Sequence, residues 1–226
     1  MRVFVVTGHY GSGKSEFSVN LALVLRSREQ SVALADVDVV NPYFRSREQR
    51  ALLEHHGIRV IGNTMGVDRG VDIPAVSADV YGPLTDGTTT TVIDAGGDPV
   101  GARLLGSFRR LIPLNETEVL CVVNALRPST RAVDGVIEQI QGIETASGLR
   151  ISGLVNNTHL LEHTEVEQVL AGDLLCGAVT EQTGIPVRYV AAVKPVIDAL
   201  PDDVAGERIT IGMHLRDAWM LTAKEA

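Results

Sequence analysis

Eight consecutive residues near the start of the chain combine glycines, one lysine and one hydroxyl at a fixed spacing: Gly8-His9-Tyr10-Gly11-Ser12-Gly13-Lys14-Ser15. They match G-x-x-x-x-G-K-[ST], a pattern in which a glycine-rich turn aims several backbone N–H groups at one phosphate. Lys14 would reach the β- and γ-phosphates, and the Ser15 hydroxyl would bind Mg²⁺. The residues predicted to contact the nucleotide here are Gly8, Gly11, Ser12, Gly13, Lys14 and Ser15. The alternative is an ordinary glycine-rich turn between a strand and a helix.

The lysine of this motif is unusual in the chain. The sequence has 17 arginines and only three lysines, Lys14, Lys194 and Lys224. Arginine therefore serves nearly everywhere that a generic cation suffices. A lysine in the one position where the phosphate motif requires it strengthens the prediction of a catalytic Lys14.

Two further acidic motifs follow apolar segments. Asp36 and Asp38 end the stretch Val32–Asp38, and Asp94 ends Thr90–Asp94. Carboxylates at the carboxyl ends of strands lie where open α/β sheets bind ligands. We expect Asp38 to position the attacking water or to hold the metal's outer shell, and Asp36 and Asp94 to serve the metal.

Glycines and asparagines supply the remaining candidates. The pair Gly96-Gly97 can bring a backbone N–H onto the γ-phosphate, which would make that loop sense the nucleotide state. Asp98 before Pro99 is more simply a helix N-cap. Asn156 and Asn157 offer amide groups suited to an adenine edge, although a turn favoured by asparagine explains them equally. The guanine signature Asn-Lys-x-Asp is missing from the sequence, which favours ATP over GTP.

The elements that must position these residues alternate along the chain. Seven apolar segments predict strands, and they are Arg2–Thr7, Val32–Asp36, Ile58–Ile61, Thr90–Asp94, Glu118–Val123, Ile151–Val155 and Val187–Ala191. Helices are predicted between them, at Lys14–Arg28, Arg45–His56, Val100–Ile112, Ser129–Ser147, Thr164–Thr183 and Met213–Ala223. Strands that are apolar on both faces are typical of a mainly parallel sheet with helices on both sides. We predict a three-layer, doubly wound α/β fold with about seven strands.

Length and composition limit the remaining possibilities. The 226 residues show no linker, and they predict a single domain over residues 1–226. The net charge of −8 argues against a nucleic-acid partner, because phosphate contacts need a basic face. No apolar run approaches the roughly 20 residues of a membrane helix, so no membrane partner is expected. Two widely spaced cysteines indicate a reduced, cytoplasmic protein without a zinc or iron–sulfur site.

With these motifs in this order, the chain resembles the MinD/ParA/CobQ (SIMIBI-type) class of P-loop NTPases. Within it, Gly8–Lys14 and the stretch Asp-Val-Val-Asn-Pro-Tyr-Phe-Arg (Asp38–Arg45) look like an uncharacterised ATP-binding branch. The resemblance implies ATP with Mg²⁺ as cofactors. It implies that Asp38 orients the hydrolytic water, that Asp94 holds the water shell of the metal, and that Gly97 contacts the γ-phosphate.

The same class contains members that enclose two ATP molecules between two subunits with a signature lysine near the start of the loop. This chain has His9 there, which is shorter than lysine and mostly neutral at pH 7. A nucleotide-dependent homodimer is thus one arrangement to test, beside an unknown protein partner.

Two functions follow from these expectations. The first is a slow, Mg²⁺-dependent ATPase whose switch loops drive partner exchange between ATP and ADP states. The second is an ATP-dependent small-molecule kinase or ligase of the CobQ or dethiobiotin-synthetase type, with the excursion Gly62–Gly87 housing the substrate.

Overall fold

A parallel sheet forms the centre of the protein. The computed structural model describes residues 2–38, 49–62 and 80–215. The strands are β1 (Val3–Gly8), β2 (Val32–Asp36), β3 (Ile58–Ile61), β4 (Thr90–Asp94), β5 (Thr117–Val123), β6 (Gly153–Asn156), β7 (Val187–Ala192) and β8 (Glu207–Thr210). Their order in the sheet is β3-β2-β4-β1-β5-β6-β7-β8, and every neighbouring pair is parallel.

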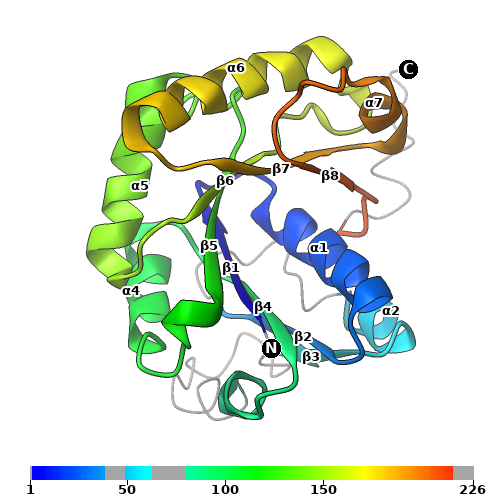
Figure 1. Ribbon diagram of the computed structural model, residues 1–226, viewed down its shortest axis with the longest axis vertical. Coiled ribbons are helices and arrows are strands. Elements are labelled where there is room, and N and C mark those ends of the chain that lie inside the picture. Colours follow the sequence, from blue (N-terminus) through cyan, green and yellow to red (C-terminus); the bar gives the residue numbers. More distant parts are fainter. Residues whose placement is uncertain (1, 39–48, 63–79, 216–226) are drawn as a thin grey trace, which may run out of the picture.

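Helices cover both faces of this sheet (Figure 1). They are α1 (Lys14–Arg28), α2 (Arg50–His55), α4 (Pro99–Ser107), α5 (Val133–Ser147), α6 (Val166–Thr183) and α7 (Lys194–Ala199). In Figure 1, α1 and α2 lie on one side of the sheet, and α4 and α5 lie on the other. The predicted three-layer α/β fold is confirmed, with eight strands in the described sheet.

Alternation along the central strand builds two separate cores. Val3 and Val5 of β1 point into the cluster beneath α4, α5 and α6, whereas Phe4 and Val6 point into the cluster beneath α1. All four side chains are buried, because a strand with helices on both faces leaves neither side to water.

The topology places a crevice at the carboxyl end of β1. The chain leaves β1 toward β2 on one side, and it leaves β4 toward β5 on the other. Loops that follow strands on either side of such a reversal diverge, and open α/β sheets bind ligands in the gap.

Several predicted boundaries differ from the structure. The eighth strand, β8, was not predicted, because only Ile209 of its four residues is fully buried and its ends are polar. Helix α5 begins at Val133 rather than Ser129, since the Thr130 hydroxyl donates to Asn124 O (2.7 Å) and holds a loop there. Helix α4 ends at Ser107, soon after Gly106, which is a poor helix former.

Other predictions fall partly outside the described residues. The helix predicted at Arg45–His56 is described only from residue 49, where α2 occupies Arg50–His55. Residues 213–215 are not helical, and the rest of the helix predicted at Met213–Ala223 is not described. Of the excursion Gly62–Gly87, residues 80–85 form a helix whose Val80 and Leu84 enter the core, and residues 63–79 are not described.

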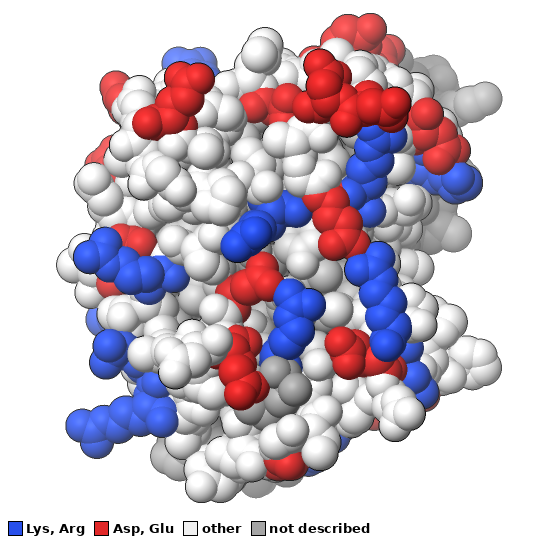
Figure 2. Space-filling view, viewed as in Figure 1, with Lys and Arg blue, Asp and Glu red and all other residues white. Residues whose placement is uncertain are grey.

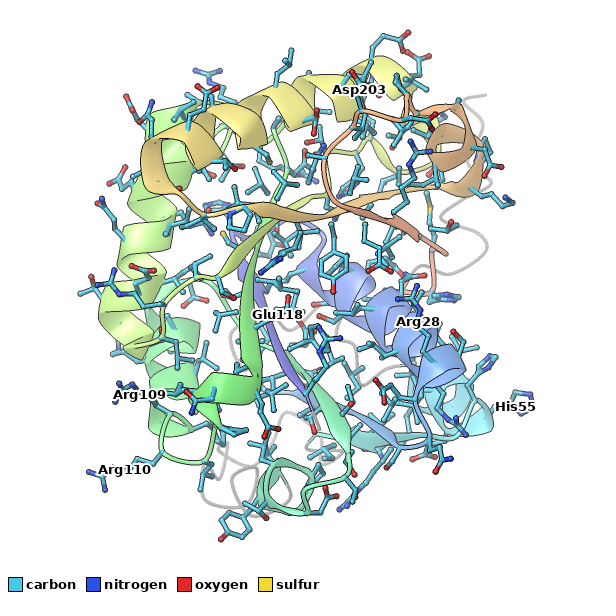
Figure 3. All side chains as sticks on the ribbon, viewed as in Figure 1. Arg28, His55, Arg109, Arg110, Glu118 and Asp203 are labelled. Atoms are coloured by element: carbon cyan, nitrogen blue, oxygen red, sulfur yellow. The ribbon has the colours of Figure 1, made fainter. Side chains whose placement is uncertain are left out.

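The edge of the sheet where the strands begin carries ion pairs. Glu118 at the start of β5 pairs with Arg2, and Arg28 at the end of α1 pairs with Glu207 at 2.7 Å. Figure 3 shows Glu118 near the middle of this view and Arg28 farther to the right, on α1. Basic and acidic side chains alternate across the middle of the same face in Figure 2, so it presents mixed charge.

Candidate functional site

The predicted phosphate loop connects β1 to α1. Strand β1 ends at Gly8, α1 begins at Lys14, and the N–H of Ser12 donates to His9 O (3.0 Å) to close the turn between them. Gly13 precedes the helix with φ +82°, and no side chain caps the helix start. A Cβ on Gly13 would lie 2.4 Å from Asn157 Nδ2, so only glycine fits. The first turn of α1 therefore offers its positive end and its N–H groups to a ligand at the loop.

Lys14 and Asp38 form a buried ion pair behind this loop. The Nζ of Lys14 lies 3.0 Å from Oδ2 of Asp38, and the two side chains are 6% and 4% exposed. The backbone N–H of Asp38 donates to Oδ1 of Asp36 (3.2 Å). The structure thus brings together the lysine of the first motif and both carboxylates of the second.

Asp94 approaches the same place from β4. It is fully buried and accepts a hydrogen bond at Oδ1 from the Ser18 hydroxyl (3.3 Å), one turn beyond Ser15 on α1. Asp36 and Asp94 are register partners at the ends of β2 and β4. One hydroxyl and two neighbouring carboxylates are oxygen donors of the kind that Mg²⁺ prefers.

These donors fit a metal that is also held by phosphate oxygens. Within the described ranges, no group of three or more His, Cys, Asp or Glu side chains could hold a metal ion. Mg²⁺ in nucleotide sites is usually held by one or two protein groups together with waters and phosphates. Ser15 would bind it directly, and Asp94 and Asp36 would orient its waters.

The Gly96-Gly97 loop packs directly against the phosphate loop. A Cβ on Gly97 would lie only 2.2 Å from Gly8 O, so the two backbones touch and a side chain cannot be accommodated. Asp98 caps α4 by accepting from Val100 N (2.8 Å) and Gly101 N (3.1 Å), which confirms its interpretation as an N-cap.

The two asparagines after β6 have different surroundings. The Nδ2 of Asn157 donates to Ser12 O (2.8 Å), and this side chain lines the main cavity. Asn156 is fully buried and donates to Val169 O (2.9 Å) on α6, while its Oδ1 accepts from Thr158 N. The structure therefore brings Asn157 to the loop and places Asn156 in the packing of α6 instead.

A cavity of about 610 Å³ opens beside the loop. Its polar end is formed by the phosphate loop and by the start of α1, including Lys14 and Ser15. Its other end is largely apolar and comes from the chain after β6, β7 and β8; it is lined by Leu161, Ala192, Val193, Ile211, Met213 and Leu215. A charged end joined to an apolar end suits a molecule with a phosphate tail and a flat, weakly polar head.

A second cavity of about 340 Å³ shares His9, Tyr10 and Ser129 with the first. The rest of its lining comes from the loop before α4, the start of α4 and one face of α5: Gly97, Asp98, Pro99, Ala102, Gly135, Glu138, Gln139, Gly142 and Ile143. Because Gly97 touches Gly8, this cavity borders the phosphate end of the first one.

Two contacts at the site join segments that are distant in the sequence. Arg127 donates from Nε to Gly11 O (2.8 Å) and so contacts the loop. Residues 211–215 after β8 form part of the cavity wall. The sequence identifies Gly11 as part of the glycine-rich loop, but it gives no sign that Arg127 contacts it. The cavity wall follows β8, and this strand was not predicted.

The cysteines take no part in this chemistry. Burial raises the pKa of Cys121 and that of Cys176 to about 12, so both thiols stay protonated near neutral pH. Both are buried and free of disulfides. Among the described residues, no helix combines the length and apolar character needed to cross a bilayer.

No protein-family model and no curated protein matches the chain. Solved structures resemble it in fold. FtsY of Thermotoga maritima is 21% identical with a TM-score of 0.58, over 84% of this chain and 61% of that one. Chloroplast FtsY of Physcomitrella patens is 18% identical with a TM-score of 0.60, over 90% and 62%.

The 54 kDa signal recognition particle protein of Aeropyrum pernix, solved with GDP, is 22% identical with a TM-score of 0.57, over 84% and 41%. The chain thus spans less than two thirds of the length of each of these structures. At these identities the likeness shows a shared fold, and it does not test the resemblance to the MinD/ParA/CobQ class. The fold of this chain is that of the P-loop NTPases.

Proposed function

We propose that the protein binds ATP with Mg²⁺, hydrolyses it slowly, and uses the change from ATP to ADP to exchange a partner. The observation that carries this proposal is the buried Lys14 at the first turn of α1, which lines the cavity together with the glycines of the loop before it. A phosphate bound here would offset the cost of burying the ammonium of Lys14.

The loop also has an unmet polar group. Within the described residues, the Ser12 hydroxyl is buried and has no hydrogen-bond partner. Buried polar atoms of this kind are costly and are commonly completed by a ligand or by water. The Ser12 hydroxyl is fully buried and does not line the cavity, so a ligand reaches it only if the loop moves. The N–H groups at the start of α1 are the groups that a phosphate in the loop would meet.

The apolar end of the cavity supports adenine over guanine. Guanine presents N–H donors that are usually read by a carboxylate or carbonyl acceptor. Among the described lining residues, Glu16 is the only acid, and its carboxylate accepts hydrogen bonds from His214 N (2.7 Å) and Leu215 N (3.0 Å). Because one structural neighbour was solved with GDP, GTP is the competitor that the first experiment must include.

The residues have separate tasks in hydrolysis. Lys14 and the loop N–H groups stabilise the charge that develops on the γ-phosphoryl group. Asp38 aligns the attacking water, and the N–H of Gly97 contacts the γ-phosphate. When bound, Mg²⁺ neutralises phosphate charge, and Ser15, Asp94 and Asp36 are the groups that would hold it and its waters.

Titration calorimetry of the purified protein tests the binding step. We expect heat of association with Mg-ATP and a weaker signal with Mg-GTP. If the folded protein gives no heat with either nucleotide, the proposal that it binds a nucleotide is wrong. If GTP binds more tightly than ATP, the preference for adenine over guanine is wrong.

Partner exchange needs its own experiment. Protein immobilised with ATP and with ADP should retain different proteins from a cell extract. Sedimentation with each nucleotide tests whether a homodimer forms despite His9 at the position of the signature lysine. An unchanged mass and an identical set of retained proteins in both states would remove the switch from the proposal.

The second cavity favours one alternative, transfer of the γ-phosphoryl group to a small acceptor. It borders the phosphate end of the site, and within the described residues the buried Nε2 of Gln139 lacks a hydrogen-bond partner. The nearby Asp98 and Glu138 favour a hydroxyl or amino compound as the acceptor, because they would repel a carboxylate.

Filling this cavity distinguishes the two functions. A Cβ on Gly142 of α5 meets nothing within 4 Å, and the same holds for Gly177 of α6, which makes the two a matched pair. If the cavity holds an acceptor, Gly142→Leu should abolish retention of a small molecule that wild type and Gly177→Leu retain from an extract, as read by mass spectrometry. Equal retention by all three proteins excludes the acceptor site.

A further inference from the structure

The segment that follows β8 is fastened to α1 by side chains of that helix. In Figure 1, β8 leads toward α1. The Nδ2 of Asn20 donates to Gly212 O (2.9 Å), and Gly212 N donates back to Asn20 Oδ1 (2.8 Å). Asn20 is buried, so this reciprocal pair is shielded from water.

Glu16 provides the second fastening, one turn earlier on the helix. Its Oε1 accepts from His214 N (2.7 Å), and its Oε2 accepts from Leu215 N (3.0 Å). A carboxylate that accepts two backbone N–H groups makes charge-assisted bonds, which are shorter and stronger than neutral ones. Glu16 and Asn20 are four residues apart and therefore lie on one face of α1.

The same segment forms the apolar wall of the main cavity. Ile211, Met213 and Leu215 line it, and Ile211 N donates to Ala192 O (2.8 Å). One helix thus carries the phosphate-binding groups Lys14 and Ser15 at its start and holds the opposite wall with the residues that follow.

We infer that Glu16 and Asn20 are positioning residues that fix the nucleoside wall, residues 211–215, of the nucleotide site. The inference rests on the proposed function, because the wall is assigned to the nucleoside of a bound nucleotide. Glu16 and Asn20 bond to the backbone of the wall and hold it in place, and Glu16 also lines the cavity. They set the fit of the base and ribose, whereas the phosphate grip stays with the loop.

A comparison of ATP with inorganic tripolyphosphate tests this division. Tripolyphosphate presents the phosphate tail without a nucleoside, so its affinity reports the loop alone. We expect Glu16→Ala and Asn20→Ala to weaken Mg-ATP binding at least about tenfold and to leave tripolyphosphate binding unchanged, because only the nucleoside wall is loosened. Glu16→Gln keeps one acceptor oxygen and should recover part of the loss.

Glu167→Ala is the matched control, since Glu167 is an exposed acid in the first turn of α6. It should bind both ligands as wild type does. Equal weakening of ATP and tripolyphosphate in Glu16→Ala overturns the inference, as does unchanged ATP affinity. Wild type that binds ATP no better than tripolyphosphate also overturns it.

Hydrogen exchange keeps the inference testable apart from nucleotide binding. The amides of His214 and Leu215 donate to Glu16, so they should exchange faster in Glu16→Ala than in wild type. If wild type binds no nucleotide, the proposed function is wrong. Faster exchange in Glu16→Ala would still show that Glu16 holds residues 214 and 215 in place. Unchanged exchange at both amides would show that Glu16 does not hold the wall.

Discussion

The ammonium of Lys14 lies 3.0 Å from a carboxylate oxygen of Asp38, with both side chains almost fully buried. Removing two charges from water is costly, and their mutual attraction offsets that cost. A phosphate that binds in the loop would take Lys14 as its own partner. Asp38 would therefore lose its ion pair with Lys14 when a nucleotide binds. Two predictions follow from this pair, one for each residue.

Replacement of Asp38 separates binding from hydrolysis. Asp38→Asn removes the carboxylate that competes for Lys14, so we expect Mg-ATP affinity equal to or above that of wild type. Turnover should fall at least about tenfold, or about 1.4 kcal/mol of barrier, because the water loses its orienting base. Calorimetry and phosphate release measure the two effects. Asp203→Asn, on the exposed loop after α7 (Figure 3), is the control, and lost affinity with an unaltered rate would make Asp38 a structural residue.

Replacement of Lys14 should abolish the phosphate grip. We expect Lys14→Ala to weaken ATP binding about 100-fold, since it removes a charge-assisted contact from a site shielded from water. Lys194→Ala removes an exposed lysine that pairs with Asp198 at 2.8 Å, and it should bind normally.

Loss of Lys14 also leaves a buried carboxylate beside an empty space, which costs about 3–5 kcal/mol of stability. The double variant Lys14→Ala with Asp38→Asn removes both charges and should fold while still failing to bind. Normal ATP affinity in this folded double variant would refute the phosphate-loop interpretation.

The metal prediction concerns Ser15. In the presence of a chelator, Ser15→Ala should bind ATP with the affinity of wild type. With Mg²⁺ present, its affinity for ATP should be about tenfold lower than that of wild type. Calorimetry with and without Mg²⁺ measures the difference. Ser27→Ala on the exposed end of α1 is the control, since the Ser27 hydroxyl donates to Val24 O within its own helix. An equal loss with and without the metal would place Ser15 in the loop's packing instead.

A pH prediction follows from the turn before β4. Hydrogen bonds from the Thr89 hydroxyl and from the N–H groups of Thr88 and Thr89 lower the pKa of Asp86 from 3.8 to about 2. A carboxyl whose pKa is lower in the folded state stabilises the fold above its unfolded pKa, and this contribution fades as the pH falls through the folded value.

The stability difference between wild type and Asp86→Asn should therefore shrink as the pH falls from about 4 to about 2. Urea midpoints at several pH values measure it. Asp86 is exposed, so solvent screening keeps the effect small. A difference that stays constant across this range would show that the bonds favour neither form of the carboxyl.

Local patterns predicted the fold well, and they predicted the position of the glycine-lysine-serine turn between a strand and a helix. The first four residues of β1, Val3–Val6, are apolar and buried, and the glycine-lysine-serine turn follows the strand. Such patterns involve residues close in sequence, so they can be read without knowledge of the tertiary structure. The same reasoning identified Asp98 before Pro99 as a helix cap.

Contacts between distant segments could not be predicted in this way. Arg127 reaches Gly11 across 116 residues, and Glu16 reaches His214 across 198. Nothing near either residue in the sequence indicates its partner. Asn156 and Asn157 show the same limit, because successive residues at a strand end point in different directions. The β6–β7 pairing also shifts register between Leu154 and Val155, so alternation alone could not assign the two asparagines.

The position of β1 in the middle of the sheet has a consequence for synthesis on the ribosome. Its first residue pairs with Thr91 on one side and with Thr117 on the other, and the loop after it is completed by Asn157, 145 residues beyond Ser12. A nascent chain emerges from its amino end, so the motif appears first and its supports appear much later. Until they emerge, the glycine-rich end of β1 lacks the strands and the side chain that position it. The loop should therefore bind a ligand only after the chain has been translated beyond Asn157.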